Sequence, residues 1–472
     1  ITKIVKSHPF LVSGNIVGTF AESYSLRGAS DIDTEVIFDK LDRSKFFAVL
    51  RDFEILAKNL ESKYGIEVLV NNTLGPLKFN EESIVFHLMF YDIRSHKSHC
   101  LESPFTCFDW QRSRKYIKKP IERIYSIKHL QPSYFFSARR SIQDYLKDVE
   151  SGSISYRSYA FDRKGRVLEK KMYKKMDNRH KIEFSYHICK FLILNFLKLY
   201  YRSNKKPNFK AILDLYFKLF PKNESIHRAF INGLHSMKAR GDFTEVFDTE
   251  KNLERFLRDF EEQFKGYFYS RNSKNIVFIR HAPTDINKPG AFLGQRIDNS
   301  IKTISMKEAD KLKEFSSYSM ISSSLKRCVE TIRRIFGSRS SLITSDLLTE
   351  IDYGLIDGKD FFYLSENYPE IVSAWEFGED PRFPQGENSA DVQGRLLSFI
   401  NSLKGYQDKN ILVCTHNVVL RILIGTHANI PMRDWHKIKI EPLDPIRCVI
   451  AGDGRLFLNL TREQMEKMFA DL

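Results

Sequence analysis

Two histidines, His281 and His416, each follow a short apolar run in the C-terminal half of the chain. Runs of this kind, rich in β-branched residues, are typical of buried parallel strands. In an open α/β sheet, ligands bind at the carboxyl ends of the strands, so two imidazoles about 135 residues apart can reach one pocket. Arg280, Arg327 and Arg421 add positive charge in the same segment. The residue types therefore predict a pocket for an anion, and a phosphate group is the anion that we expect.

Hydrolysis of a phosphomonoester needs a nucleophile, cations that hold the phosphoryl oxygens, and an acid that protonates the leaving oxygen. The last 200 or so residues supply all three within six motifs. The motifs are IVFIRHAPTDIN (276–287), FLGQRID (292–298), ISSSLKRCVET (321–331), LLTEIDYGLIDG (347–358), PQGENSADVQGR (384–395) and VCTHNVVLR (413–421). In this order they resemble the histidine phosphatase superfamily, also called phosphoglycerate-mutase-like, over nearly the whole segment. The resemblance implies a doubly wound α/β/α domain.

The resemblance also implies a role for the polar side chains of these motifs. His281 would be the nucleophile that becomes phosphorylated, and Glu350 would be the proton donor. The phosphoryl group would be bound by Arg280, Arg327 and His416, with further contacts from Asn287 and Gln295. No metal would be needed at this site, because fixed positive charge stabilises the transition state.

Two positions depart from the pattern of the superfamily. Ala282 stands where glycine is usual, and Asn417 follows the second histidine where phosphatases often have glycine. Neither change removes a functional group, so we expect activity to be retained. The segment is compact and lacks long insertions, which favours a phosphatase over a mutase.

A second set of polar residues lies near the N-terminus, in IVGTFAESYSLRGASDIDTEVIF (16–38). Gly18 ends a predicted strand, where glycine lets a nucleotide phosphate approach the backbone, and Thr19 adds a hydroxyl. Asp31 and Asp33 open another strand, and alternate residues of a strand point the same way, so both carboxylates face one site. Paired aspartates suit Mg²⁺, which accompanies a nucleoside triphosphate. Two such ions could activate an acceptor and stabilise the departing pyrophosphate.

This stretch resembles the nucleotidyltransferase superfamily of the polymerase-β type, whose signature is Gly-Ser followed about a dozen residues later by Asp-x-Asp. Thr19 replaces the serine, and Ala21 and Ser30 match the minimal subgroup. The resemblance covers roughly the first 95 residues. It implies an NTP substrate, Mg²⁺ bound by Asp31 and Asp33, and a nucleotide bound by Ser30 and the Gly-Thr pair.

The superfamily usually presents a third carboxylate on a later strand, and residues 66–92 have the required shape. The expected register places His87 at that position, with Asp92 at the strand end and Glu67 on the neighbouring strand. His87 could ligate a metal, or the reaction could use two carboxylates. Alternatively, the domain could bind a nucleotide without transferring it.

These motifs fall into a multidomain α/β protein. Residues 1–125 alternate strands with one long helix and form the nucleotidyltransferase α/β domain. Residues 126–270 are amphipathic and helical, and form an accessory domain that completes the cleft. After the polar stretch SRNSKN, residues 274–472 alternate strands and helices again, as in the histidine phosphatase domain. The basic runs of the middle domain interleave with tyrosines, namely Tyr156, Tyr159 and Tyr173.

Composition limits the classes of protein further. The net charge of +15 favours anionic ligands without choosing among nucleotides, nucleic acid and phosphorylated metabolites. No run approaches the roughly 20 apolar residues of a membrane span, and no signal peptide is recognisable. The six scattered cysteines indicate a reducing cytoplasm. A zinc site is a less favoured alternative for His96, His99, Cys100 and Cys107, because their spacing matches no common zinc finger.

The sequence thus predicts a bifunctional cytoplasmic enzyme. One domain would transfer a nucleotidyl group to a small phosphorylated or sugar-like metabolite, and the other would remove a phosphate. Nucleic acid is the less favoured acceptor, in an enzyme that processes RNA ends, and a regulator that senses nucleotides is the third alternative. The sequence leaves the oligomeric state open.

Overall fold

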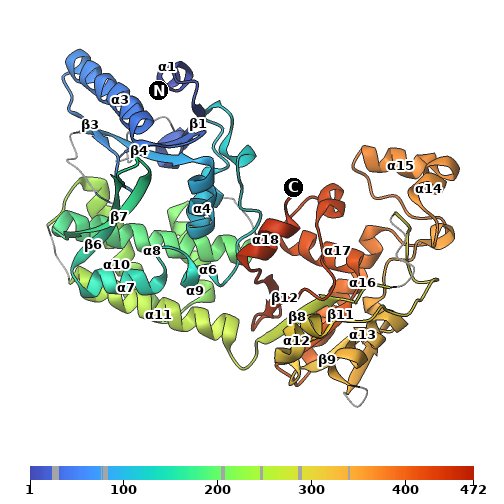
Figure 1. Cartoon of the computed structure of the whole chain (residues 1–472). Coiled ribbons are helices and arrows are strands. Elements are labelled where there is room, and N and C mark those ends of the chain that lie inside the picture. Colours follow the sequence, from blue (N-terminus) through green and yellow to red (C-terminus); the bar gives the residue numbers. More distant parts are fainter. Residues whose placement is uncertain are drawn as a thin grey trace. The chain divides into compact units, whose positions relative to one another are not determined.

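The computed structural model describes residues 1–23, 31–75, 77, 83–202, 208–244, 248–284, 290–337 and 341–472. Contacts divide the chain into two compact units, Ile1–Gln263 and Phe264–Leu472 (Figure 1). The division falls inside one helix, α11 (Thr249–Tyr269). The domain boundaries expected near residues 125 and 270 stay predictions.

A five-stranded mixed sheet lies at the centre of the first unit, in the order β3-β4-β2-β1-β5. Its strands are β1 (Leu11–Ile16), β2 (Ile32–Phe38), β3 (Val68–Asn71), β4 (Ile84–Asp92) and β5 (Tyr116–Lys118). β2 and β3 both run parallel to β4, whereas β1 is antiparallel to β2 and to β5. The parallel register sets Asp33 of β2 opposite His87 of β4.

Helix α3 (Arg43–Tyr64) packs its apolar face against this sheet. Asp42 caps its N-terminus, where the carboxylate accepts a backbone N–H of the first turn, and Gly65 caps its C-terminus with a φ of 65°, in the left-handed region. Phe46 and Phe53 are fully buried in the core between α3 and the strands. This helix therefore fixes the sheet from one side.

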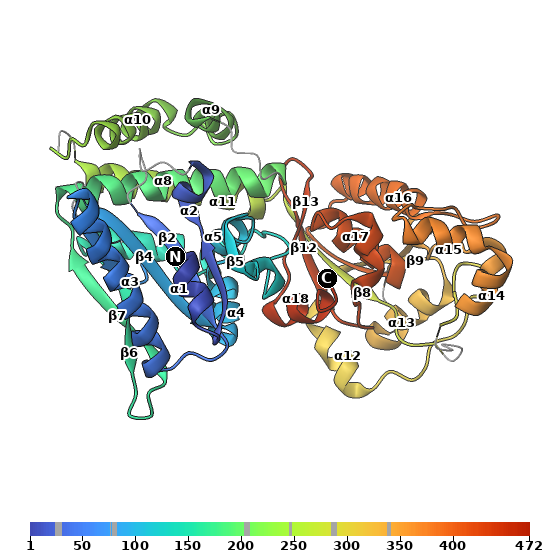
Figure 2. The same ribbon diagram turned by 90° about the horizontal axis from the view of Figure 1, so that it is seen from above.

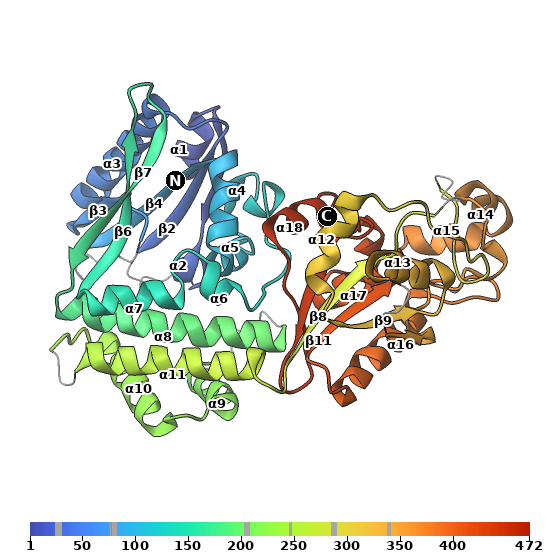
Figure 3. The ribbon, with the colours of Figure 1, turned by 60° about the horizontal axis from the view of Figure 1, so that its bottom comes forward.

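Helices form most of the remainder of the first unit (Figure 3). The longer ones are α7 (Ile142–Glu150), α8 (Asn178–Tyr201), α9 (Phe209–Leu219), α10 (Glu224–Arg240) and α11. α8 packs against both α9 and α10. Stacked aromatic rings join them, with the ring centroids of Phe196 and Phe220 4.3 Å apart and Phe260 edge-on to Phe196.

A β-hairpin interrupts this helical region, so the prediction of a purely helical segment from 126 to 270 is wrong at that point. Its strands, β6 (Ser153–Phe161) and β7 (Val167–Lys175), are antiparallel and form a two-stranded sheet. The stretch SISYRSYAF is rich in aromatic residues, and the turn that follows contains Gly165 at a φ of 73°. Such a run followed by a glycine turn is a hairpin signal, which the many lysines of β7 obscured in the sequence.

The second unit contains a six-stranded sheet in the order β10-β9-β11-β8-β12-β13. Its strands are β8 (Lys274–Arg280), β9 (Ser319–Ser323), β10 (Leu342–Ser345), β11 (Asn410–Thr415), β12 (Ile446–Ile450) and β13 (Leu456–Leu458). β8, β9, β10 and β11 are parallel, whereas β12 is antiparallel to both of its neighbours. The carboxyl ends of β8 and β11 therefore lie next to each other, as expected for strands that deliver His281 and His416.

Helices cover both faces of this sheet (Figure 2). α12 (Met306–Leu312) and α13 (Lys326–Phe336) lie on one face, and α16 (Ser389–Ser402) and α17 (Asn417–His427) lie on the other. The core on the first face includes Leu312, Cys328 and Ile332 of the helices, packed against Val277 and Ile279 of β8. In the part of the chain that the structure describes, no helix is long and apolar enough to cross a membrane.

Candidate functional site

His281 lies directly after β8 at the carboxyl edge of the second sheet. Its backbone N–H donates to the carbonyl of Thr415, the last residue of β11, at 3.0 Å. Its ring Nδ1 lies 2.7 Å from the carbonyl oxygen of Ala282. Because a carbonyl can only accept, Nδ1 carries the proton and Nε2 keeps its lone pair. The strand end thus presents one histidine nitrogen as a base or a nucleophile.

The surroundings of His281 keep this ring neutral. Burial, followed by the positive charges of Arg327 and Arg280, lowers the pKa of His281 to about 3. The imidazole is therefore unprotonated over the physiological range of pH. A neutral imidazole beside fixed cations is suited to attack the phosphorus of a bound phosphate ester.

Arg327, on the first turn of α13, joins three of the sequence motifs. Its Nε donates to Nδ1 of His416 at 3.1 Å. Its two terminal nitrogens donate to the carbonyl oxygens of Ile297 (3.1 Å) and Gly294 (2.8 Å) in the 292–298 loop. The side chain is almost fully buried. Arg327 therefore places a fixed positive charge beside both histidines.

His416 is fully buried, and its ring centroid lies 5.1 Å from that of His281. Its Nδ1 accepts a hydrogen bond from Arg327, so the proton sits on Nε2, which donates to the Ser323 hydroxyl at 2.8 Å. Burial and the charge of Arg327 hold the pKa of His416 well below its usual range. The sheet thus brings the two strand-end histidines together.

Arg280 extends from the last position of β8 into the same region. One terminal nitrogen donates to the carbonyl of Ile440 at 2.9 Å. Its buried Nε has no hydrogen-bond partner among the described residues. An unpaired buried donor is costly, and a bound anion would satisfy it.

Glu350 follows a short 3₁₀ turn (Asp346–Leu348) and is almost fully buried. One carboxylate oxygen accepts from the backbone N–H of Ile351 at 3.1 Å, and the other from that of Val418 at 3.3 Å. Burial raises the pKa of Glu350 above its usual value, although the charges of Arg327 and Arg280 oppose the change. A raised pKa favours the protonated form of the carboxyl group, which is the form that can donate a proton.

Two residues that the sequence did not single out hold the Glu350 segment in place. Arg395 of α16 donates to the carbonyl of Thr349 at 2.6 Å and to that of Glu350 at 3.1 Å. The carboxylate of Glu387 accepts from Arg395 Nε at 2.9 Å and from the backbone N–H of Asp352 at 3.0 Å. Both residues belong to the PQGENSADVQGR motif. The sequence analysis identified this motif but did not predict that its side chains hold the Glu350 segment.

Gln295 belongs to the hydrogen-bond network around Glu350, and its predicted contact with a phosphate stays a prediction. Its amide nitrogen donates to the Glu350 carbonyl at 2.8 Å and approaches the Glu387 carboxylate at 3.4 Å. Asn287 lies outside the described residues. The backbone of Ala282 does not need the left-handed conformation, and its N–H donates to the Thr331 hydroxyl at 3.0 Å, so alanine replaces glycine there without strain.

A second cluster lies in the first unit, where the start of β2 runs beside β4. Asp31, Asp33 and His87 each offer a ligand atom, and these atoms lie within 4.8 Å of one another. It is the one such group of three or more His, Cys, Asp or Glu found among the described residues. The alternation along β2 and the parallel register with β4 bring the three side chains together.

Hydrogen bonds of His87 bear on whether it fits a metal. Its Nδ1 lies 2.7 Å from an oxygen of Asp33, and its Nε2 lies 2.7 Å from the carbonyl of Thr73. Burial would lower the pKa of His87, but the hydrogen bond and charge of Asp33 outweigh it, and the pKa is raised. Asp31 and Asp33 fit a hard oxygen-seeking ion such as Mg²⁺. His87 in this geometry positions Asp33, and it would have to give up one hydrogen bond to become a ligand.

The other residues weighed for this cluster lie apart from it. The side chain of Asp92 caps helix α4 (Ile93–Glu102) by accepting from the backbone N–H of Ser95, and Glu67 is exposed. Ser30 lies outside the described residues, and nothing is described of the Thr19 side chain. The four residues considered for zinc do not form a metal-binding group among those described, and His96 instead pairs with Glu35 at 2.8 Å.

Gly18 begins helix α2 (Gly18–Ser23) with a φ of 73°. A Cβ at this position would overlap Oδ2 of Asp33, so glycine leaves room here for that carboxylate, and the predicted approach of a phosphate to Gly18 stays a prediction. We expect Gly18→Ala to destabilise the first unit by about 2–4 kcal/mol, because left-handed strain of roughly 1–2 kcal/mol adds to the clash. Chemical denaturation would measure this loss.

Gly65→Ala is the matched control, since Gly65 has a similar φ of 65° but nothing within 4 Å of its would-be Cβ. This variant should show the backbone strain alone. Equal losses in the two variants would contradict the close approach of Gly18 to Asp33.

Known proteins resemble the second unit. Residues 276–461 match the histidine phosphatase superfamily (branch 1). Phosphoserine phosphatase 1 of Hydrogenobacter thermophilus is 28% identical over 157 residues, which cover 31% of this chain and 73% of that protein. Fructose-2,6-bisphosphatase of Saccharomyces cerevisiae is 28% identical over 177 residues, or 36% of this chain and 38% of that protein.

Solved structures give similar coverage. The phosphoserine phosphatase of Entamoeba histolytica, in complex with 3-phosphoglyceric acid, has a TM-score of 0.35 and 18% identity, and the match covers 40% of this chain and 99% of that one. The segment matched by the family includes His281, Glu350 and His416.

Proposed function

We propose that the histidine phosphatase domain, residues 276–461, hydrolyses a phosphomonoester of a small molecule. The reaction would pass through a phosphohistidine on His281. The proposal is carried by a neutral His281, whose Nε2 keeps its lone pair, in the same domain as Glu350, a buried carboxyl group of raised pKa. Arg280, Arg327 and His416 surround the place where the phosphoryl group would bind. Together they supply the nucleophile, the acid and the positive charge.

The reaction would proceed in two steps. In the first, the lone pair of His281 Nε2 forms a bond to phosphorus, the ester P–O bond breaks, and Glu350 gives its proton to the leaving oxygen. In the second, water attacks phosphorus, Glu350 takes a proton from that water, and the P–N bond breaks to release phosphate. Arg280 and Arg327 stabilise the charge on the phosphoryl oxygens in both steps.

Release of inorganic phosphate distinguishes a phosphatase from a mutase. The purified protein should release phosphate from members of a panel of phosphorylated sugars, amino acids and glycerates, together with p-nitrophenyl phosphate. Transfer between positions of a phosphoglycerate without release of phosphate would contradict the proposal and indicate a mutase.

Glu350→Gln should show whether the carboxyl group is the proton donor. We expect kcat to fall about 10²–10⁴-fold for alkyl phosphates, and far less for p-nitrophenyl phosphate, whose leaving group needs no proton. A donor must be protonated, so the rate should fall as pH rises through the pKa of Glu350. Because burial raises that pKa, the falling limb should lie at higher pH than for an ordinary glutamate.

Steady-state kinetics across pH on both substrates would measure these effects. The exposed Glu463→Gln is the control and should leave the profile unchanged. An equal loss on both substrates, with the alkaline limb still present, would argue against Glu350 as the donor.

For the first unit we propose transfer of a nucleotidyl group from an NTP to a small phosphorylated or sugar-like metabolite. The observation that favours it is the grouping of Asp31 and Asp33 beside Gly18, the first residue of α2. Asp31 and Asp33 would hold Mg²⁺, which would activate the acceptor and neutralise the leaving pyrophosphate. His87 keeps Asp33 in position through its Nδ1.

The two activities, since they share one chain, would catalyse consecutive steps of one pathway. To test this, the protein is incubated with all four NTPs, Mg²⁺ and a metabolite extract, and wild type is compared with His281→Ala. A nucleotide-linked or phosphorylated compound should accumulate only in the variant. NTP binding without any transfer would instead indicate a regulator that senses nucleotides.

A further inference from the structure

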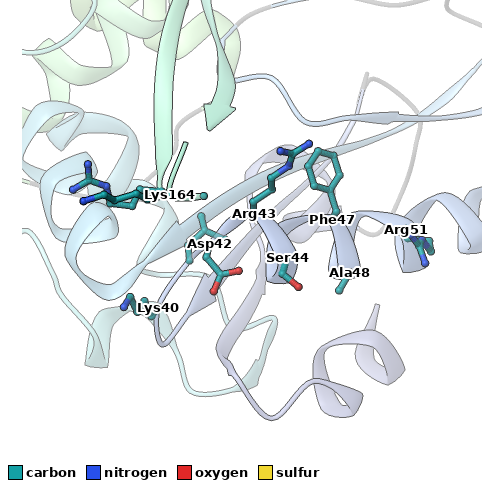
Figure 4. Close-up of a pocket in the computed structure, with 11 residues that line it drawn as sticks. Lys40, Asp42, Arg43, Ser44, Phe47, Ala48, Arg51 and Lys164 are labelled. Carbon is teal, nitrogen blue, oxygen red and sulfur yellow. The ribbon is translucent and has the colours of Figure 1, made fainter. Parts of the chain in front are cut away.

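A basic pocket lies where the tip of the β6–β7 hairpin meets the start of α3 (Figure 4). Its volume is about 840 Å³. Five cationic side chains line it, namely Lys40, Arg43, Arg51, Lys164 and Arg166. The one acidic lining residue is Asp42, whose carboxylate is already engaged by the N–H of Lys45. The pocket therefore carries a large excess of positive charge.

Backbone contacts hold the hairpin tip against α3. The N–H of Arg43 donates to the carbonyl of Gly165 at 3.0 Å, and Asp42 and Arg166 form an isolated β-bridge. The ring of Phe47 is 44% exposed within the pocket, and the Arg43 guanidinium lies 6.0 Å from its centroid. The pocket thus offers an aromatic surface next to cations.

Strand β7 continues the positive charge along the hairpin. Four of its residues are exposed lysines, namely Lys170, Lys171, Lys174 and Lys175. The one acid on the strand, Glu169, pairs with Arg157 and Arg139, so it does not neutralise these lysines. These lysines span roughly 17 Å of strand, with Lys170 and Lys174 on one face of the hairpin and Lys171 and Lys175 on the other.

The tyrosines of the hairpin differ in their surroundings. Tyr159 packs on Phe46, and its hydroxyl bonds the backbone of Phe90 at 2.7 and 3.0 Å, so it belongs to the core. Tyr173 is 62% exposed, with Nζ of Lys171 5.3 Å from its ring. Tyr173 and Phe47 therefore present accessible rings on the hairpin and in the pocket.

We propose that this basic hairpin surface, made of β7 and the pocket at its tip, binds single-stranded nucleic acid. Cations that follow a backbone, interleaved with exposed aromatic rings on which bases stack, are the combination that single-strand binders use. Paired bases of a duplex could not stack on Tyr173 or Phe47. A folded acidic protein or a membrane would use the charge but would have no need of the exposed rings.

The surface is distinct from the cluster of Asp31, Asp33 and His87. β2 starts at that cluster and ends near Lys40 in the pocket. The length of the strand therefore separates the cluster from the pocket by about 20 Å. The middle of the hairpin nevertheless approaches the cluster. Arg157 forms an isolated β-bridge with Leu74, and the preceding residue, Thr73, is hydrogen-bonded to His87 through its carbonyl. A strand bound along the hairpin would pass beside it. The proposal goes beyond both proposed activities and holds whether or not either one occurs.

Fluorescence anisotropy with a fluorescein-labelled 20-nucleotide oligouridine, without NTP or metal, tests this surface on the full-length chain. Lys170→Ala/Lys171→Ala/Lys174→Ala/Lys175→Ala should weaken binding at least tenfold at moderate salt. The slope of log K against log salt concentration should become shallower by at least about 1.4, because two lysines share a face and each one that neutralises a phosphate of a single strand contributes roughly 0.7. Arg43→Ala/Arg51→Ala should likewise weaken binding.

The matched control carries the same change in net charge at exposed lysines elsewhere in the first unit. It is Lys58→Ala/Lys63→Ala/Lys210→Ala/Lys218→Ala, and it should bind within about twofold of wild type. Replacing the four β7 lysines with arginine should retain binding, which shows that charge is required and that the hairpin folds. Tyr173→Phe should bind like wild type, whereas Tyr173→Ala should bind several-fold more weakly.

Two outcomes would overturn the proposal. One is equal binding by the β7 variant and its control. In that case the lysines only protect an open strand edge, and the variant would self-associate in light scattering. The other is binding to vesicles of phosphatidylserine but not to the oligonucleotide, which would identify a membrane surface.

Discussion

His281→Ala is expected to abolish phosphate release by the C-terminal domain, with kcat reduced roughly 10⁴–10⁶-fold. The large effect follows from the covalent step, because the variant lacks the nitrogen that would form the bond to phosphorus. His416 lies nearby, but its Nδ1 accepts from Arg327 and its Nε2 donates to Ser323. Neither of its nitrogens has a lone pair free to attack.

Steady-state release of phosphate and trapping of labelled protein would measure this loss. Wild type incubated briefly with a ³²P-labelled substrate and quenched in alkali should carry acid-labile label, and His281→Ala should carry none. His436→Ala, at an exposed histidine of the same unit, is the control and should label normally. Label retained by His281→Ala would show that a different residue is the nucleophile.

The position of the two histidines could be predicted because it depends on rules that act locally. A short apolar run predicts a buried strand, and parallel strands end at the same edge, so residues that follow two such strands meet. The register of β11 with β8, which sets Thr415 opposite Arg280, follows that rule. The family match confirms the histidine phosphatase fold of residues 276–461, while the roles of single residues stay predictions.

The network around Glu350 could not be predicted in this way. Arg395 holds it through backbone carbonyls, which every residue possesses, so no residue type in the sequence marks the partner. The same holds for Gln295, whose amide bonds the carbonyl of Glu350. A side chain that bonds a distant backbone group depends on tertiary packing, and spacing along the chain does not encode it.

The hairpin and Gly18 show a different limit. The lysines of β7 fit an exposed helix face as well as an exposed strand, because the pattern of buried apolar residues on a two-stranded ribbon is weak. The sequence predicts an approach of Gly18 to a phosphate, yet its absent side chain also makes room for the Asp33 carboxylate. In both cases the sequence identifies a residue of interest, but which groups surround that residue depends on the fold.

Asp31→Asn/Asp33→Asn is expected to abolish nucleotidyl transfer and divalent-ion binding in the first unit. The change keeps the size of both side chains and removes two negative charges from a cluster whose ligand atoms lie within 4.8 Å of one another. Without these charges nothing in the cluster offsets the cost of dehydrating a divalent cation. We expect transfer from α-³²P-labelled NTP to fall at least about 10³-fold.

Binding of Mn²⁺, followed by electron paramagnetic resonance, gives a readout that does not require the acceptor to be known. Wild type should bind the ion, the double variant should bind it at least about tenfold more weakly, and Asp39→Asn/Asp214→Asn should match wild type. His87→Gln separates the remaining alternatives, because glutamine can still hydrogen-bond Asp33 but is a poor ligand. Unchanged Mn²⁺ affinity in His87→Gln would assign that residue to positioning Asp33, and two carboxylates would then be sufficient to hold the ion. A wild-type protein that binds neither Mn²⁺ nor NTP would refute the nucleotidyl transfer proposed for this unit and leave the phosphatase proposal untouched.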